Sequence, residues 1–177
     1  MAILDSGSNT YQERQTSVNV AEFLFEYYCA EKEYKLTRIG FDEKNKNVDD
    51  FFKLNKFLRN IPDYIVNTPK GTFVVNVKGT GNFKEKEIDM LPYFKQWYST
   101  EQAPLIYAFC FTGKDPILVY PDKLIELWGK STNKQWPDGV VYRHLELWLK
   151  MKRSALIRLQ NSDVFYAPKS LGLKALR

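Results

Sequence analysis

The chain has 177 residues, 44% hydrophobic and 15% aromatic, which suits one domain with a full hydrophobic core. Its net charge of +5 and pI near 9.0 favour an anionic partner such as nucleic acid. Two separated cysteines, Cys29 and Cys110, argue against a disulfide scaffold or a zinc ribbon, and one histidine, His144, excludes a multi-histidine metal site. With no apolar run near the ~20 residues of a membrane helix and no signal peptide, we expect a cytoplasmic protein without a membrane partner.

The first third of the chain predicts a helix, a strand and a second helix. Residues 1–16 are polar and are expected to form a flexible arm, so that the single domain spans 17–177. Apolar residues at helical spacing predict a helix over 17–32, and Glu22 and Glu26 lie one turn apart on a neighbouring face of it. Alternation predicts a strand over 34–41. Helical spacing of phenylalanine and leucine predicts a helix over 48–60.

Two β-rich runs, 63–68 and 72–79, flank the turn Pro69-Lys70-Gly71 and predict a hairpin with a three-residue turn. A glycine-containing loop follows, and 84–99 is predicted to be a helix that Pro92 bends or starts.

The last third predicts two strands and a short helix before a basic tail. The continuous apolar run 104–112 is typical of a strand buried on both faces, and 117–121 is a further strand. Asp122 could cap a helix over 122–129, whereas 140–149 suits either a strand or a helix. This order of elements predicts an α/β domain with a central mixed sheet flanked by helices.

The hairpin carries the residues with the most chemical information. Asp63 begins one strand, and Asn76 and Lys78 lie two apart on its partner, so their side chains share one face. A carboxylate, an amide oxygen and an ammonium group can therefore meet at one end of the hairpin. A lysine that closes a run of valines needs a partner or a chemical role.

Pro62-Asp63 and Asn76-Val77-Lys78 resemble the motif of the PD-(D/E)xK nuclease superfamily, which includes many restriction enzymes and Holliday-junction resolvases. Ala21-Glu22 fits the place of the first-helix glutamate in that family. The resemblance covers roughly residues 18–120 and departs at Asn76, where the family has Asp or Glu. It implies a restriction-endonuclease-like core.

The resemblance also implies roles for these residues. Asp63 would bind Mg²⁺ or Mn²⁺, with Asn76, the Val77 carbonyl and Glu22 as further ligands, since such cations prefer oxygen. Lys78 would act in catalysis with Asp63 and Glu22, by activating the attacking water or stabilising charge on the phosphate. The implied function is a metal-dependent endonuclease that hydrolyses phosphodiester bonds in DNA, with RNA as a second substrate class, of the junction-resolving or restriction type. Such enzymes pair their sites, so we expect a homodimer.

Asn76 leaves three outcomes open. In the first, its amide oxygen serves as a ligand. In the second, a carboxylate from elsewhere takes its place, namely Glu26, Asp49, Asp50 or Glu85. In the third outcome the fold is a catalytically inactive nucleic-acid-binding module. An unrelated α/β interaction domain whose charge only aids solubility is a weaker alternative.

Several polar residues are candidates for contact with the nucleic-acid backbone. They lie in the loop after the hairpin, on the helix that follows and in the C-terminal tail: Thr80, Lys84, Lys86, Lys95, Gln96, Lys150, Lys152 and Arg153. His144 stands in an apolar stretch without a motif, so we expect a structural or surface role for it.

Overall fold

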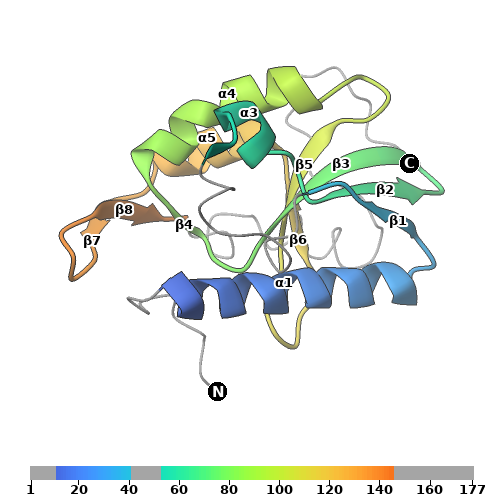
Figure 1. Cartoon of the computed structure of the whole chain (residues 1–177), viewed down its shortest axis with the longest axis horizontal. Helices are drawn as coiled ribbons and strands as arrows, with labels where there is room; N and C mark the ends of the chain where they lie inside the picture. The colour runs from blue at the N-terminus through green and yellow to red at the C-terminus, as the bar shows by residue number, and fades with distance from the viewer. Residues whose placement is uncertain (1–10, 41–52, 146–177) are drawn as a thin grey trace.

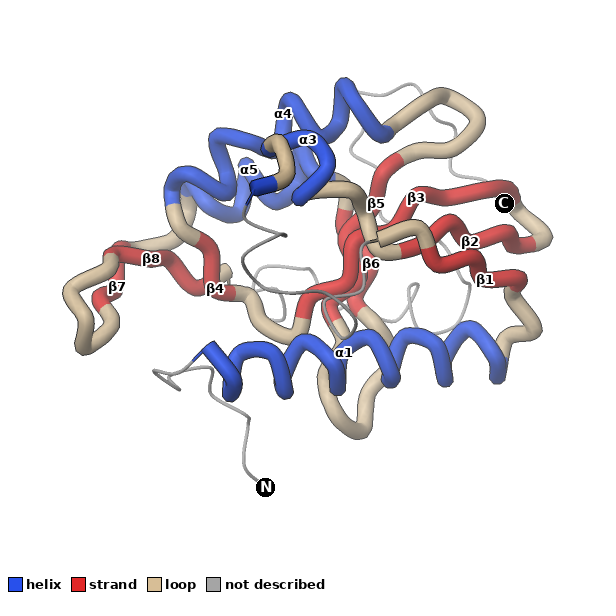
Figure 2. The backbone as a smooth tube through the Cα atoms, in the orientation of Figure 1, coloured by secondary structure: helices blue, strands red, loops and turns tan. Residues whose placement is uncertain are grey.

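The computed structural model describes residues 11–40 and 53–145. Its elements in chain order are α1 (Tyr11–Glu31), β1 (Lys35–Arg38), α3 (Lys56–Arg59), β2 (Tyr64–Thr68), β3 (Gly71–Lys78), β4 (Asn82–Phe83), α4 (Glu85–Tyr98), β5 (Leu105–Phe109), β6 (Ile117–Val119), α5 (Pro121–Gly129), β7 (Asn133–Gln135) and β8 (Val141–His144). A five-stranded sheet has the strand order β1-β2-β3-β5-β6, and helices lie on both of its sides (Figures 1 and 2). This confirms the predicted α/β class and the mixed sheet.

Strand direction follows from the length of each connection. The short turn between β2 and β3 makes them antiparallel, whereas β3 and β5 are parallel and are joined by a crossover through α4. The strands β1 and β6 add antiparallel edges to this centre. The polar ends of β2 and β3 therefore lie beside the start of the α4 crossover.

Alternation along β3 divides the core into two halves. Phe73, Val75 and Val77 are buried on the α1 side, and Val74 packs on the opposite side with residues of β5, α4 and α5. All five residues of β5 are buried, as a strand covered on both faces requires. The sheet thus forms the middle layer, with α1 on one side and α4 and α5 on the other (Figure 1).

Some predicted boundaries shift. The helix α1 begins at Tyr11, so it extends into the stretch assigned to the N-terminal arm. The hairpin turn has two residues rather than three, because Thr68 pairs with Gly71, whose φ of +139° favours glycine. Tyr120 is the N-cap of α5, and Asp122 lies in its first turn rather than at the cap.

The helix predicted over 48–60 is described from residue 53 onward. There, α3 covers Lys56–Arg59, and the side chain of Asn55 caps it by accepting a hydrogen bond from the Leu58 N–H. The continuous helix α4 includes Pro92 within it.

The ambiguous run 140–149 is a strand in its described part. This strand, β8, pairs with β4 and β7 in a small three-stranded sheet that projects beside α4 and α5 (Figure 1). No helix among residues 11–40 and 53–145 is long and apolar enough to cross a membrane.

Candidate functional site

The ladder between β2 and β3 ends at Pro62-Asp63. Tyr64 is the last paired residue and faces Val75, so the same register would set Asp63 against Asn76 and, at the next hydrogen-bonding position, Pro62 against Val77. Proline has no N–H and cannot donate to the Val77 carbonyl. The Val77 N–H instead donates to Asp63 Oδ2 at 2.6 Å. The proline therefore ends the hydrogen-bond ladder of the hairpin, and the Asp63 side chain accepts the Val77 N–H at this open end.

Asp63 is also fixed through its main chain. Its carbonyl oxygen accepts the N–H groups of Ile39 and Gly40, at 2.9 and 3.1 Å. A Cβ added at Gly40 would lie 3.0 Å from the Asp63 Cα and 3.3 Å from the Pro62 oxygen. Only glycine lets the chain after β1 approach so closely, and this approach sets the position of Asp63.

A row of polar side chains crosses the sheet on the α4 side. One residue beyond the last β2–β3 pair, Asp63 stands opposite Asn76, and Asn76 pairs in register with Tyr107 of β5. The Asn76 side chain hydrogen-bonds to the Tyr107 hydroxyl. Lys78 is two residues further along β3, and its ammonium lies 5.7 Å from the centre of the Phe83 ring and 3.9 Å from Glu87 Oε1.

These residues line a cleft of about 410 Å³. Its walls come from the open end of the hairpin, the end of α3, β5 and one side of α4: Arg59, Asn60, Ile61, Asp63, Asn76, Lys78, Phe83, Lys86, Glu87, Met90, Leu91, Phe94 and Tyr107. The structure thus brings together Asp63, Asn76 and Lys78, the three hairpin residues that the sequence singled out.

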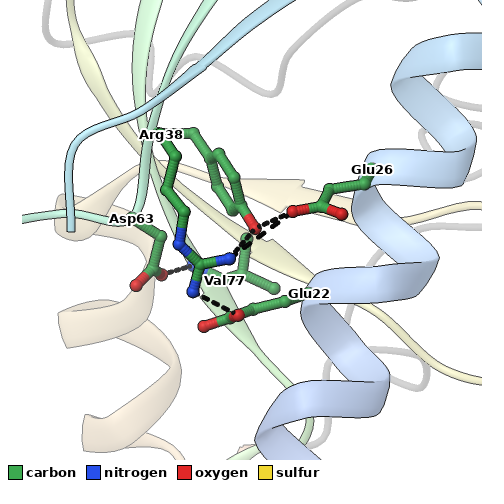
Figure 3. Close-up of polar contacts among 6 residues, drawn as sticks. Glu22, Glu26, Arg38, Asp63 and Val77 are labelled. Atoms are coloured by element: carbon green, nitrogen blue, oxygen red, sulfur yellow. Dashed lines mark hydrogen bonds and ion pairs between the residues drawn. The ribbon is translucent and has the colours of Figure 1, made fainter. Parts of the chain in front are cut away.

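Glu22 lies on the other side of Asp63 in a network of its own. Arg38 Nη2 donates to Glu22 Oε2 at 2.7 Å, and Arg38 Nη1 lies 3.5 Å from Glu26 Oε1. The Tyr64 hydroxyl donates to Glu26 at 2.6 Å. Figure 3 shows the Arg38 guanidinium between Asp63 and the two glutamates of α1. An arginine therefore neutralises the glutamate that the sequence assigned to the metal.

Burial raises the pKa of Asp63 to about 6. The hydrogen bond from Val77 lowers it, the negative charge of Glu22 raises it, and the positive charges of Lys78 and Arg38 lower it. Burial outweighs the favourable contacts because it removes water from the ionised form. Near neutral pH this partly buried carboxylate is charged, and positive charge beside it stabilises that form.

The donor set suits a hard divalent cation. Among residues 11–40 and 53–145, no three His, Cys, Asp or Glu side chains gather closely enough to hold a metal ion. The oxygens at the hairpin opening come from different groups: the Asp63 carboxylate, the Asn76 amide and the Val77 carbonyl, which Pro62 cannot engage. Magnesium binds mixed oxygen ligands of this kind and keeps several waters, so these residues fit it.

The residues considered as replacements for the missing acid lie elsewhere. Glu26 is bonded to Tyr64, and Glu85 is exposed in the first turn of α4 and does not line the cleft. Asp49 and Asp50 are outside the described residues. Glu87, which the sequence did not single out, is the α4 carboxylate in the cleft, and its other oxygen accepts the Lys84 N–H.

The predicted backbone-binding residues separate into groups. Lys86 lines the cleft, whereas Lys95 forms an ion pair with Asp122 at 2.7 Å. The Lys84 ammonium lies over the Trp136 ring, and the Thr80 hydroxyl accepts the Asn82 N–H. Gln96 is exposed on α4 and is not a cleft residue. Lys150, Lys152 and Arg153 lie outside the described residues.

The sequence did not single out two basic residues of the site, Arg38 and Arg59. Arg38 stands at the end of an ordinary strand pattern, and Arg59 follows an apolar helical run, so neither has a motif. A sheet register would have been needed to find Arg38, because it is opposite Tyr64.

His144 Nδ1 lies 2.6 Å from the Asn82 side-chain oxygen, a contact that joins β8 to β4.

No protein-family model matches the chain, and the search of curated proteins finds no similar sequence.

Proposed function

We propose that this protein is a divalent-metal-dependent nuclease, and that the cleft at the open end of the β2–β3 hairpin is its reaction centre. The observation that carries the proposal is that Asp63, Asn76 and Lys78 line one cleft, where the Val77 main chain bonds to Asp63. The element order, with a helix, a three-strand meander, a crossover helix and a parallel strand, is also the order that the resemblance to PD-(D/E)xK nucleases leads one to expect.

Three groups of this chain would hold the cation: the Asp63 carboxylate, the Asn76 amide oxygen and the Val77 carbonyl. When bound, Mg²⁺ or Mn²⁺ would supply Lewis-acid polarisation of the phosphodiester. Glu22 lies close enough to Asp63 to raise its pKa and adds negative charge to the site from the α1 side. Arg38 balances this charge in the metal-free protein.

Lys78 is the catalytic cation of the proposal. It lines the cleft with Asn76, and its ammonium is 3.9 Å from Glu87 Oε1 and 5.7 Å from the centre of the Phe83 ring. An ammonium in such a place stabilises the negative charge that develops on the phosphate and orients the attacking water. Lys86 and Arg59, on the cleft walls, supply further positive charge for the nucleic-acid backbone.

DNA is the proposed substrate class, with RNA as the second, and hydrolysis of a junction or of a restriction-type target is the proposed activity. Cutting both strands of a duplex needs two such sites, which a homodimer would provide. In such a cut, one scissile phosphate would lie between Asp63 and Lys78, which both line the cleft.

A second function follows from the same residues if the site does not catalyse. Asn76 brings no charge, its side chain is bonded to Tyr107, and Arg38 already neutralises Glu22. With Asp63 as the remaining hairpin carboxylate, the domain would bind nucleic acid without cutting it.

The test is cleavage of labelled four-way-junction, duplex and single-stranded DNA with Mg²⁺ or Mn²⁺. We expect Asp63→Asn and Lys78→Ala to lose cleavage by at least about 100-fold. Lys70→Ala, at the turn end of the same hairpin, is the matched control and should cut normally. If the wild type binds DNA in a salt-dependent way but cuts none of the three substrates, the binding module replaces the nuclease.

A further inference from the structure

A continuous aromatic surface begins at the cleft and runs outward over α3 and α4. Phe94 lines the cleft, and its ring centre lies 6.1 Å from that of Trp97. Trp97 also contacts Tyr93, at 6.1 Å, and Phe57 of α3, at 5.4 Å. Tyr93, Phe57 and Trp97 are 52%, 42% and 39% exposed. We call the side chains of Phe57, Tyr93, Phe94 and Trp97 the α3–α4 aromatic surface.

Contacts between α3 and α4 support this surface. Phe57 stacks on Tyr98 with 5.2 Å between ring centres, and the Tyr98 hydroxyl donates to the Phe57 carbonyl at 2.7 Å. These contacts fix the short helix α3 to the end of α4. Part of the surface is thus packed in place without a ligand, so the protein side loses little entropy when a partner stacks on it.

Positive charge stands where the aromatic surface meets the cleft. Arg59 of α3 and Lys86 of α4 both line the cleft. Among the described residues, Arg59 Nε is a buried side-chain nitrogen without a hydrogen-bond partner. Such a donor is costly to leave unbonded, and the planar guanidinium matches a phosphate with two parallel hydrogen bonds. A small movement of the side chain into the cleft would give Arg59 that acceptor.

We propose that the α3–α4 aromatic surface binds single-stranded nucleic acid. Arg59 takes a phosphate next to the one at Asp63, and Trp97 and Tyr93 stack the bases that follow. Base faces are free in a single strand and are covered by neighbouring base pairs in a duplex, so exposed rings beside a cationic cleft favour the single strand. This inference rests on the proposed function and names its substrate class: strands that are single-stranded beside the cut.

The experiment measures binding of a fluorescently labelled oligothymidylate of about 12 nucleotides, a length within the usual site size. A duplex of the same length is the comparison. The full chain is used in EDTA, so that no cutting occurs. We expect Trp97→Ala and Tyr93→Ala each to weaken single-strand binding about tenfold, since one base stack is lost, and to leave duplex binding within about twofold.

Tyr27→Ala is the matched control for Tyr93→Ala. Both tyrosines are more than half exposed on a helix, but Tyr27 lies on α1, on the opposite side of the sheet. The Tyr27→Ala variant should bind the single strand and the duplex as the wild type does. Arg59→Gln should weaken single-strand binding and lower the slope of log affinity against log salt by about 0.7, the value for one phosphate contact.

The outcomes separate this inference from the proposed function. If Trp97→Ala and Tyr93→Ala bind the single strand as the wild type does, the inference is overturned, whether or not the wild type cuts duplex DNA with Mg²⁺. Equal losses for duplex and single strand in both variants would also overturn it. Tyr93 is the more exposed of the two, so its variant gives the answer if Trp97→Ala does not fold.

Discussion

The two sides of Asp63 differ in how their charges are partnered. On the α1 side, Arg38 bonds to Glu22 at 2.7 Å, and Tyr64 bonds to Glu26 at 2.6 Å. On the α4 side, Lys78 stands 3.9 Å from Glu87, and Arg59 Nε is buried with no hydrogen-bond partner in the described part of the chain. Both sides have similar residue types beside the same carboxylate. The α1 network is therefore satisfied within the protein, whereas the groups of the cleft retain the capacity to bind a ligand.

This contrast explains why Glu22 and Glu87 differ in their availability to bind a metal or another ligand. Glu22 is buried and paired with Arg38, so it can bind a metal only if this ion pair breaks. Glu87 lies in the cleft, and its Oε1 is 3.9 Å from the Lys78 ammonium, a long distance for an ion pair. We expect the satisfied side to contribute mainly to stability and the cleft side to ligand binding, and four changes test that division.

The largest effect on stability is expected for Arg38→Ala. It leaves the buried Glu22 carboxylate unpaired and weakens the contact with Tyr64, which should lower the free energy of unfolding by about 3 kcal/mol. Urea unfolding measures this. Lys95→Ala removes an ion pair of the same 2.7 Å length whose members are each about a third exposed, and it should cost at most about 1 kcal/mol. Equal losses would show that the α1 network is no more tightly held than a surface pair.

Asp63→Asn should stabilise the protein above pH 6. The folded pKa of about 6 exceeds the ordinary value of 3.8, so the stability that the carboxyl contributes is complete below pH 4 and is lost as pH rises to 6. Removing the charge should therefore add about 2 kcal/mol at pH 8 and little at pH 4. Thermal unfolding at both pH values checks this.

The same variant tests metal binding without an activity assay. Millimolar Mg²⁺ should raise the melting temperature of the wild type at pH 8, because it binds the folded state. It should not raise that of Asp63→Asn. An equal rise in both proteins would place the cation away from the hairpin opening.

Gly40→Ala probes the point where the two sides meet. Its Cβ would stand 3.0 Å from the Asp63 Cα, and backbone has to move to admit it, so we expect a loss of about 1–2 kcal/mol. Gly129→Ala is the control, because a Cβ there meets nothing within 4 Å. It should be neutral or slightly stabilising. Cleavage by Gly40→Ala should fall further than its stability predicts, since Asp63 is displaced.

Glu87→Gln should have the smallest effect on stability, about 0.5 kcal/mol or less. Glutamine keeps an oxygen for the Lys84 N–H at the start of α4 and loses only the charge. Cleavage should nevertheless change, because the charge opposite Lys78 is gone. Glu126→Gln on α5, which bonds to Lys123 and Lys130 away from the cleft, is the control. If both variants cut equally, Glu87 has no part in the site.

The sequence determined the elements and the face that each hairpin residue occupies. Alternation along 72–79 buried the valines and put Asn76 and Lys78 on one side, because successive strand residues point to opposite faces. Pro62 marked the end of the ladder, since proline cannot donate a hydrogen bond. The meeting of Asp63 with Asn76 and Lys78 was thus predictable from the chain.

Tertiary structure alone decided which other charges joined them. Arg38 reaches Glu22 through the register of β1 on β2 and the packing of α1 across the sheet. Glu87 and Arg59 enter the cleft because α4 and α3 pack there, and the aromatic surface exists because Phe57 docks on the end of α4. Periodicity fixes the direction of a side chain within its own element. The element that faces it depends on how the layers pack, and no local pattern encodes that.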